Sequence, residues 1–412
     1  MGERISDSIE LMVIYTKLKK EECPLISFSP TEDESAFVDV AQGFAKDVIR
    51  PMARDCENNR AVDAEIIAKA EEIGVASLEF PEHWDGLELP LISQAQMFQA
   101  LSYGDLAVVQ GLPGAGDAAS IIRLDPESPV FDAYKKAGQR GVWPNVAFID
   151  AFNKEEPWAE EMQINKNGNG YTLNGVSHPV RLGAEAEYVA VAAVDTDDEP
   201  VVLWLQNPPG GERWSVKAGD YRLGLLSAGL AKLQFDDAGI QADEVLAQGD
   251  EARELITQGQ TRIRVLQAAK AVGLMEAALE YATEYTAERK AFGKVIAQFQ
   301  GVSFKIAKMA IETRIVNHLV WDAATKVDAG KKDAVEASLR ALYRAHRSSL
   351  FVTDAAVQML GGHGFVDEFP VEKWARDAQA QAGLYGRGHD LITRRGERIV
   401  NEATGAKRGV LQ

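Results

Sequence analysis

The sequence predicts an α+β protein of three parts: a helical domain, a compact β domain and a helical bundle. Apolar residues recur at helical spacing from about Ser29 to Gln139, and they alternate or form short runs from about Gly141. After Asp250 they return to long helical stripes. The 412 residues are enough for two or three domains. We expect these domains at residues 1–140, 141–247 and 248–412.

The helical domain is predicted from apolar periodicity and from the residues that end helices. A first helix carries apolar residues from Phe37 to Val48 and is expected to stop at Arg50-Pro51, because proline cannot continue the hydrogen-bond ladder. Two further helices are each closed by a glycine, which favours helix ends. They cover residues 64–73, before Gly74, and residues 92–103, before Gly104.

The β domain and the bundle differ in the length of their apolar segments. Short segments separated by Asn-Gly, Gly-Gly and Pro-Pro turns predict strands at residues 146–149, 162–165, 171–173, 188–194, 201–205 and 232–235. Three long stripes predict an antiparallel bundle, with helices at residues 263–287, 304–327 and 334–360 and a break at 328–332.

Charge and composition exclude several classes of partner. The formal charge of −18 repels phosphate backbones and anionic membranes, so we expect neither a nucleic acid nor a membrane partner. No apolar run reaches the roughly 20 residues that span a bilayer, and no cleavable leader is evident, so we expect a cytoplasmic protein. Cys23 and Cys56 are expected to be reduced thiols. No histidine pair has metal-ligand spacing, so no metal is predicted.

Two motifs near the C-terminus are specific. Residues 288–294 read Glu-Arg-Lys-Ala-Phe-Gly-Lys and precede Gln298-Phe299-Gln300, and residues 358–365 read Gln-Met-Leu-Gly-Gly-His-Gly-Phe and precede Arg376-Asp377-Ala378. In this order they resemble the acyl-CoA dehydrogenase flavoprotein family, and shorter matches such as Arg50-Pro51 extend the resemblance over nearly the whole chain. The resemblance implies a helical domain, a β-barrel-like middle domain and a C-terminal four-helix bundle, usually assembled as a tetramer around FAD.

The same resemblance implies a set of cofactor-binding residues that act across a subunit interface. In the family these positions reach the adenosine and diphosphate of the FAD bound to a neighbouring subunit. A permanently charged guanidinium suits a diphosphate, and glycines allow the backbone to approach closely. In this chain the positions are Arg289, Phe292, Gln300, Gln358, Gly361 and Gly362.

The residues that the family uses to hold its own flavin ring are not found here. The family's Thr-Glu-Pro-Gly-x-Gly-Ser-Asp loop falls on residues 149–156, which contain no glycine and no serine. The family's Trp-Ile-Thr, which packs on the isoalloxazine, falls on Pro179-Val180-Arg181. Its Arg-x-Ser-x-Thr segment falls on residues 226–230, which are mostly apolar. All three segments that hold the flavin ring in the family therefore have different residues in this chain.

The family's catalytic base is also replaced. Removing the α-proton of an acyl thioester, while hydride passes to the flavin, requires a carboxylate, but the family's glutamate position is occupied by Tyr385. A phenol with an ordinary pKa near 10 is a weak base at neutral pH. The family's alternative base position falls on Ile263. The other side chains that could lend a base are Glu155, Glu156, His389 and Asp390.

The resemblance leaves three hypotheses. The leading one is a base-less subunit of a heteromeric acyl-CoA dehydrogenase, which completes the FAD site of a partner with the same fold. Acyl-CoA is then the implied substrate class, and an electron-transfer flavoprotein is a candidate partner. The second is a homotetrameric flavoenzyme with altered chemistry, such as elimination of a good leaving group, in which Arg181 or Arg387 holds an anionic group. The third is a non-catalytic scaffold.

Overall fold

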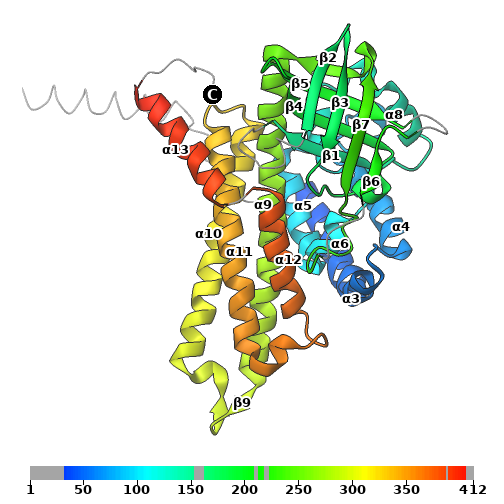
Figure 1. Cartoon of the computed structure of the whole chain (residues 1–412). Coiled ribbons are helices and arrows are strands. Elements are labelled where there is room, and N and C mark those ends of the chain that lie inside the picture. Colours follow the sequence, from blue (N-terminus) through cyan, green and yellow to red (C-terminus); the bar gives the residue numbers. More distant parts are fainter. Residues whose placement is uncertain (1–31, 153–161, 208–211, 218–221, 387, 405–412) are drawn as a thin grey trace, which may run out of the picture. The chain divides into compact units, whose positions relative to one another are not determined.

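The computed structural model describes residues 32–152, 162–207, 212–217, 222–386 and 388–404. The chain forms two compact units, Met1–Phe37 and Val38–Gln412. The second unit contains a helical part, a β part and a second helical part in that order, so the predicted α+β organisation is confirmed (Figure 1).

The N-terminal helical part consists of short helices joined by tight turns. Helix α4 (Ala64–Ile73) follows the prediction closely because both of its ends are encoded locally. The Asp63 carboxylate accepts a hydrogen bond from Glu65 N at its start, and Gly74 adopts a φ of 80° at its end. The other helices are α2 (Glu32–Phe44), α3 (Arg50–Asn59), α5 (Leu91–Gly104), α6 (Leu106–Gln110), α7 (Ala119–Ile122) and α8 (Asp132–Gly138).

The predicted stop at Arg50-Pro51 is wrong. The chain remains helical from α2 through a π-helical turn, Ala45–Ile49, into α3. Pro51 lies in the first turn of α3, where its missing N–H and fixed φ are tolerated. The π-helical turn before it is wider than an α-helical turn, which relieves the clash that a proline ring makes inside a helix.

The middle part consists of two open sheets, so the barrel-like form implied by the resemblance is not found. The sheets have strand orders β1-β4-β5-β8 and β2-β3-β7-β6, and the described strands of one sheet form no ladder with those of the other. Apolar side chains from both sheets, such as Val191 and Leu173, share one core. The strands are β1 (Val146–Ala151), β2 (Met162–Asn167), β3 (Gly170–Val176), β4 (Tyr188–Val194), β5 (Pro200–Gln206), β6 (Ser215–Lys217), β7 (Lys232–Ile240) and β8 (Val245–Gln248).

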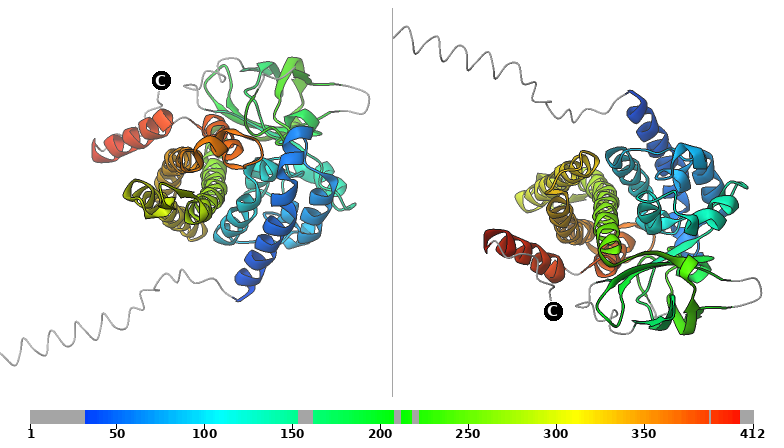
Figure 2. Two further views of the ribbon diagram at one scale, coloured as in Figure 1. Left: turned by 90° about the horizontal axis from the view of Figure 1, so that it is seen from below. Right: turned by 90° about the horizontal axis from the view of Figure 1, so that it is seen from above.

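The C-terminal part is a bundle of long helices, as predicted. Figure 2 shows it end on, with the N-terminal helices and the two sheets packed beside it. A two-stranded hairpin, β9 (Lys290–Ala291) and β10 (Lys294–Val295), joins the first two helices. The helices are α9 (Gly249–Glu288), α10 (Gln300–Asp328), α11 (Ala334–Leu360), α12 (Val371–Leu384) and α13 (Gly388–Thr404).

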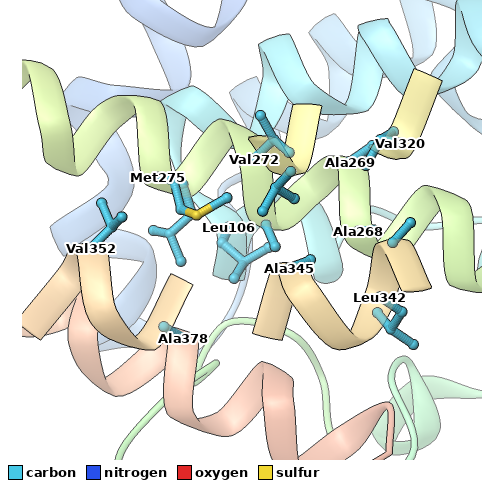
Figure 3. Close-up of a cluster of buried hydrophobic side chains, with 14 of the residues drawn as sticks. Leu106, Ala268, Ala269, Val272, Met275, Val320, Leu342, Ala345, Val352 and Ala378 are labelled. Atoms are coloured by element: carbon cyan, nitrogen blue, oxygen red, sulfur yellow. The ribbon is translucent and has the colours of Figure 1, made fainter. Parts of the chain in front are cut away.

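Small residues let the helices of this core approach one another closely. Figure 3 shows Ala268, Ala269 and Ala345 among larger apolar side chains such as Met275. Helix α5 approaches the backbone of α9 directly, because a Cβ added at Gly273 would lie 2.1 Å from the carbonyl oxygen of Gln99. Helix α9 therefore packs against several other helices, which hold the residues along it in place.

In the part of the chain that the structure describes, none of the helices combines the length and the apolar content that a membrane span needs.

Candidate functional site

The positions assigned by resemblance to the catalytic base, and two of the three segments assigned to the flavin ring, converge on one cavity, whereas residues 226–230 do not line it. Pro179–Arg181 follow β3, Ile263 lies on α9, and Tyr385 follows α12, yet all of them line the same space of about 90 Å³. Asp150 of β1 also lines it. The alignment with the family's motifs places residues 153–156 and Arg387 nearby, but they lie outside the described residues.

The Tyr385 hydroxyl is held as a hydrogen-bond donor. It donates to Asp117 Oδ2 at 2.7 Å. Burial raises the pKa of Tyr385 well above its ordinary value, and the negative charge of Asp117 raises it further. In this arrangement the phenol keeps its proton at neutral pH, so it is a poor base for removing a proton from a substrate.

Arg181 is committed to partners inside the protein. Its Nε donates to the carbonyl oxygen of Gln110 at 2.9 Å, and its Nη1 lies 3.4 Å from Asp117 Oδ1. Arg181 and the Asp117 carboxylate are both buried or nearly so, so the pair is a shielded ion pair. Arg181 therefore does not present a free positive charge to a bound anion.

A buried network of amides extends from this ion pair. Gln110 Nε2 donates to Gln267 Oε1 at 2.7 Å and to Gln381 Oε1 at 2.8 Å, and Gln381 Nε2 donates to Gln267 Oε1 at 2.9 Å. Gln267 Nε2 donates to Asp117 Oδ1 at 2.8 Å, and Lys270 Nζ donates to Gln110 Oε1 at 3.0 Å. The network joins α6, α9 and α12 and holds Asp117, which lines the cavity, in place.

Sequence reasoning missed this network. No motif marks Gln110, Asp117 or Gln381, although Gln267 and Lys270 interrupt an apolar run on α9. Burial lowers the pKa of Lys270 well below its usual value, and the nearby Arg181 lowers it further. The sequence signal that indicates such a network is a polar residue inside the apolar stripe of a helix.

The cavity does not fit a flavin ring. Sites that take a ligand of cofactor size enclose about 300–1,000 Å³, whereas this cavity has about 90 Å³. The side chains of Arg181 and Tyr385 are fixed in its wall by the hydrogen bonds described above. An isoalloxazine could enter only after these side chains had moved.

A larger apolar cleft adjoins the cavity. It has a volume of about 550 Å³ and lies between the loop after β3 and one face of α12. The two spaces share His178, Pro179 and Leu384 in their walls. Small residues of α12, Ala380 and Gly383, leave the room for it. Burial lowers the pKa of His178 to about 4, so this histidine is neutral at physiological pH.

The six residues assigned to the adenosine and diphosphate lie elsewhere, at one end of the bundle. Arg289 ends α9, Phe292 lies in the β9–β10 hairpin, and Gln300 begins α10. Gln358, Gly361 and Gly362 lie where α11 ends. All six are exposed, and Phe292 is 96% exposed. The two segments meet where the Tyr285 hydroxyl lies 2.9 Å from His363 Nδ1.

This exposed set is far from the chain's own cavity. Arg264, which lines the cavity, and Arg289 are separated by 25 residues along α9. At 1.5 Å per residue the helix places them about 37 Å apart, and Figure 1 shows α9 running from the sheets to the hairpin at β9. The structure therefore does not bring the six residues together with Tyr385 and Ile263.

The remaining candidate residues do not add a base to the cavity. Glu155 and Glu156 lie outside the described residues, and so does Cys23. His389 is exposed on α13. The side chain of Asp390 is not among those described. No group of three or more His, Cys, Asp or Glu side chains within the described ranges is arranged to hold a metal ion.

Comparison with known proteins identifies the class. The family model described as acyl-CoA dehydrogenase, N-terminal domain, matches residues 31–123, and that described as acyl-CoA dehydrogenase, C-terminal domain, matches residues 254–394. The chain belongs to the acyl-CoA dehydrogenase family.

Individual relatives agree with this assignment. An acyl-CoA dehydrogenase of Bacillus subtilis is 27% identical over 364 residues, which cover 85% of this chain and 93% of the relative. Butyryl-CoA dehydrogenase from Megasphaera elsdenii has the same fold, with a TM-score of 0.79 at 23% identity over 91% of this chain and 100% of that one. A glutaryl-CoA dehydrogenase from Mycobacterium smegmatis in complex with FADH2 gives a TM-score of 0.77 at 17% identity, over 92% and 96%.

Proposed function

We propose that this chain is a subunit of an FAD-dependent acyl-CoA dehydrogenase that lacks a catalytic base of its own and completes the FAD site of a partner with the same fold. FAD held mainly by the partner would supply the acceptor for the hydride of the acyl thioester, and the partner would supply the glutamate. This chain's own contribution is to bind the adenosine and diphosphate end of that cofactor. A cytoplasmic location remains a prediction.

The observation that carries this proposal is the position of the exposed set. Arg289 lies about 37 Å along α9 from Arg264 in the cavity wall, and Gln358 lies about 24 Å along α11 from Leu342 in the same wall, too far to serve a flavin ring there. Their exposure leaves them open to a neighbouring subunit. The exposed guanidinium of Arg289 and the accessible pair Gly361-Gly362 lie on two segments that meet at the contact between Tyr285 and His363, and they match the charge and the steric needs of a diphosphate.

The chemistry of the internal cavity supports the same conclusion. The Tyr385 hydroxyl donates a hydrogen bond to Asp117, Ile263 is apolar, and Arg181 is ion-paired. None of these three groups removes a proton from carbon at neutral pH. The acyl-CoA substrate and an electron-transfer flavoprotein partner follow from membership of the family, and for this chain they are part of the proposal.

One observation favours a second candidate, a homotetrameric flavoenzyme with altered chemistry. The apolar cleft of about 550 Å³ beside α12 is large enough for a ligand of cofactor size. In that case the chain would hold a flavin of its own through a side-chain arrangement different from the family's usual one. Arg181 would not bind the anionic part of a substrate, because Asp117 already neutralises it.

Flavin stoichiometry separates the two candidates. The purified chain is saturated with FAD, freed of excess and measured by flavin absorbance. We expect no flavin in the chain alone and about one flavin per pair of subunits when a partner with the same fold is co-expressed. About one flavin per isolated chain would refute the base-less subunit and support the second candidate. No flavin in either preparation would indicate a scaffold.

A variant locates the contribution of the exposed set. Replacing Arg289 by Ala removes the cation proposed for the diphosphate, so the complex with the partner should lose flavin on dilution. Arg253→Ala is the matched control, because Arg253 is an exposed arginine near the other end of the same helix. Equal flavin retention in the two variants would contradict the proposed role of Arg289.

A further inference from the structure

We propose that the outer face of α10 is a docking surface for an acidic amphipathic helix of a different polypeptide chain. This face, the α10 seam, consists of Phe304, Lys308, Ile311 and Ile315. Its test contains no flavin, so the docking surface and the proposed function can fail independently of each other.

Helix α10 is apolar on two faces, although a helix at the surface of a bundle needs only one. The inner face includes Met309 and Val316, which are fully buried. On the outer face Phe304, Ile311 and Ile315 are 61%, 57% and 40% exposed. At about 100° per residue these three lie within about 40° of one another, along about 16 Å of helix. The exposed residues therefore form one continuous stripe.

The spacing along this stripe is that of helices that pair with other helices. Phe304, Lys308, Ile311 and Ile315 are separated by four, three and four residues, the alternation that keeps one side of a helix facing a second helix. The seam begins about one turn after Gln300, which belongs to the exposed set at the bundle end. A helix is therefore the shape of partner that the seam fits.

The charge along the seam is positive, although the net charge of the chain is −18. Lys308 is exposed on the seam itself. Lys305 lies at one edge, where its Nζ is 5.4 Å from the centroid of the Phe351 ring of α11. Arg314 lies toward α9: burial raises the pKa of Glu276 there, and the nearby Arg314 opposes that rise.

The carboxylate of this part of α10 is directed away from the seam. From Gln300 to His318 the helix carries one acidic residue, Glu312. Glu312 accepts from Arg344 Nη2 at 2.7 and 2.6 Å and from Ser348 Oγ at 2.6 Å, and both partners lie on α11. Carboxylates that complement the seam must therefore come from the helix that binds it.

A second copy of this chain does not fit the seam. An antiparallel pair brings the ends of the two seams together, with Phe304 of one copy against Ile315 of the other. In that register Lys308 faces Ile311, so an ammonium group is desolvated against an apolar side chain. Lys305 faces Arg314, which has the same charge. In a parallel pair each Lys308 faces the other.

An acidic helix from a different chain fits both features. Apolar residues at the same spacing would cover the exposed stripe, while the aliphatic stem of Lys308 packs beside them and its ammonium meets a carboxylate. The net charge of the chain opposes an acidic partner only at long range. At physiological ionic strength the Debye length is about 8 Å, so the charges next to the seam decide the interaction.

Two labelled peptides test the preference by fluorescence anisotropy with the full-length chain. The first has the sequence of α10 with Lys305→Glu, Lys308→Glu and Arg314→Glu, and the second has the native sequence of α10. We expect saturable binding of the acidic peptide, about tenfold tighter than that of the native peptide, with a preference that shrinks as salt is added. No binding of the acidic peptide, or equal binding of both, would overturn the proposal.

A third peptide separates apolar docking from simple charge attraction. It carries the same three glutamates and also Ile311→Asp, so its apolar stripe is interrupted while its charge stays negative. We expect its binding to be lost. Binding as tight as that of the first peptide would show that charge alone is responsible, and it would overturn the docking surface.

Variants of the full-length chain locate the binding on α10. Ile311→Asp should abolish binding of the acidic peptide. Ile399→Asp is the matched control, because Ile399 is an isoleucine of α13 with 49% exposure, and it should bind as the wild type does. Lys308→Glu should weaken binding of the acidic peptide and strengthen that of the native peptide. Equal binding in the wild type and in both seam variants would place the peptide elsewhere and refute the seam.

Sedimentation equilibrium tests the alternative that a second copy covers the seam. The wild type and Ile311→Asp should have the same oligomeric state, because the seam is not used between copies of this chain. A smaller assembly for Ile311→Asp than for the wild type and Ile399→Asp would show that a second copy occupies the seam, and it would overturn the assignment to a different chain.

Discussion

The Lys373→Met variant tests how α12 is held in place beside the cavity. Lys373 Nζ lies 2.6 Å from Asp105 Oδ2 and 2.7 Å from Asp377 Oδ2, and the three side chains are at most 3% exposed. Burial alone would lower the pKa of Lys373, but the two carboxylates outweigh burial and raise it above its ordinary value. Asp377 also accepts from Leu225 N at 2.6 Å. Together they join α6, α12 and the loop before β7.

The size of the effect follows from the charges left behind. Methionine fills the volume of lysine but leaves two buried carboxylates without a cation, which costs about 3–5 kcal/mol. The unit Val38–Gln412 unfolds with an entropy of about 0.8 kcal/mol per kelvin, taking about 2.1 cal/mol/K per residue. We therefore expect Tm to fall by about 4–6 °C.

The surface of the bundle provides a matched control. Lys326 also lies between two aspartates, 3.1 Å from Asp322 and 2.8 Å from Asp333, but those carboxylates are 40% and 56% exposed. Lys326→Met should cost about 0–1 kcal/mol, because exposed ion pairs contribute little. Denaturant unfolding of both variants measures the difference. Equal losses would refute the reasoning.

The pH dependence gives Lys373→Met a second signature. Without the cation, the buried carboxylates have pKa values above their unfolded value of about 3.9. The folded variant then binds more protons than the unfolded chain as the pH falls through that range, so part of the lost stability returns on acidification. A loss that is constant between about pH 8 and pH 5 would contradict this account.

Two further predictions concern buried histidines and a close helix contact. Burial lowers the pKa of His178 and of His346 to about 4, against about 6.5 unfolded. The contribution of both histidines to the free energy of unfolding is therefore fully present above about pH 6.5, and it falls as the pH drops toward 4, by on the order of 3 kcal/mol each. We test this with the double variant His178→Gln, His346→Gln. In urea unfolding, its stability should depend less on pH than that of the wild type. Gly273→Ala forces a Cβ to 2.1 Å from the Gln99 carbonyl oxygen and should cost about 1–3 kcal/mol. Gly259→Ala meets only the end of a flexible isoleucine side chain and should be nearly neutral; equal shifts in Tm would contradict the argument.

The elements that could be predicted are those whose signals are local. Helix α4 has a capping aspartate and a closing glycine, and β4 is a continuous apolar run between turns. Pro51 predicted a helix end, but the chain stays helical because a π-helical turn before the proline accommodates its ring, and the sequence carries no local signal for that turn. Whether two sheets close into a barrel depends on strand pairing, which periodicity does not report.

The candidate site was predicted only in part, for a similar reason. The resemblance to the family assigned Tyr385, Ile263 and Arg181 to site positions, and the structure brings all three to one cavity. The partners that determine what they do, such as Asp117 and Gln267, come from other elements and carry no motif. The middle of α9 is buried on every side, so its periodicity does not show which residues face the cavity.

The three glutamines of the buried amide network have a consequence for how this sequence varies among its relatives. Gln110, Gln267 and Gln381 each depend on the other two, and their amides carry no charge that a shift in pH could alter. Replacing one of them leaves donors and acceptors on the remaining two without partners, and replacing all three also removes the acceptor of the buried Lys270 Nζ, so balance returns only when Lys270 is replaced with them. We expect natural substitutions at the three glutamines to arrive as a set together with Lys270, so an alignment of close relatives should show these four columns changing together.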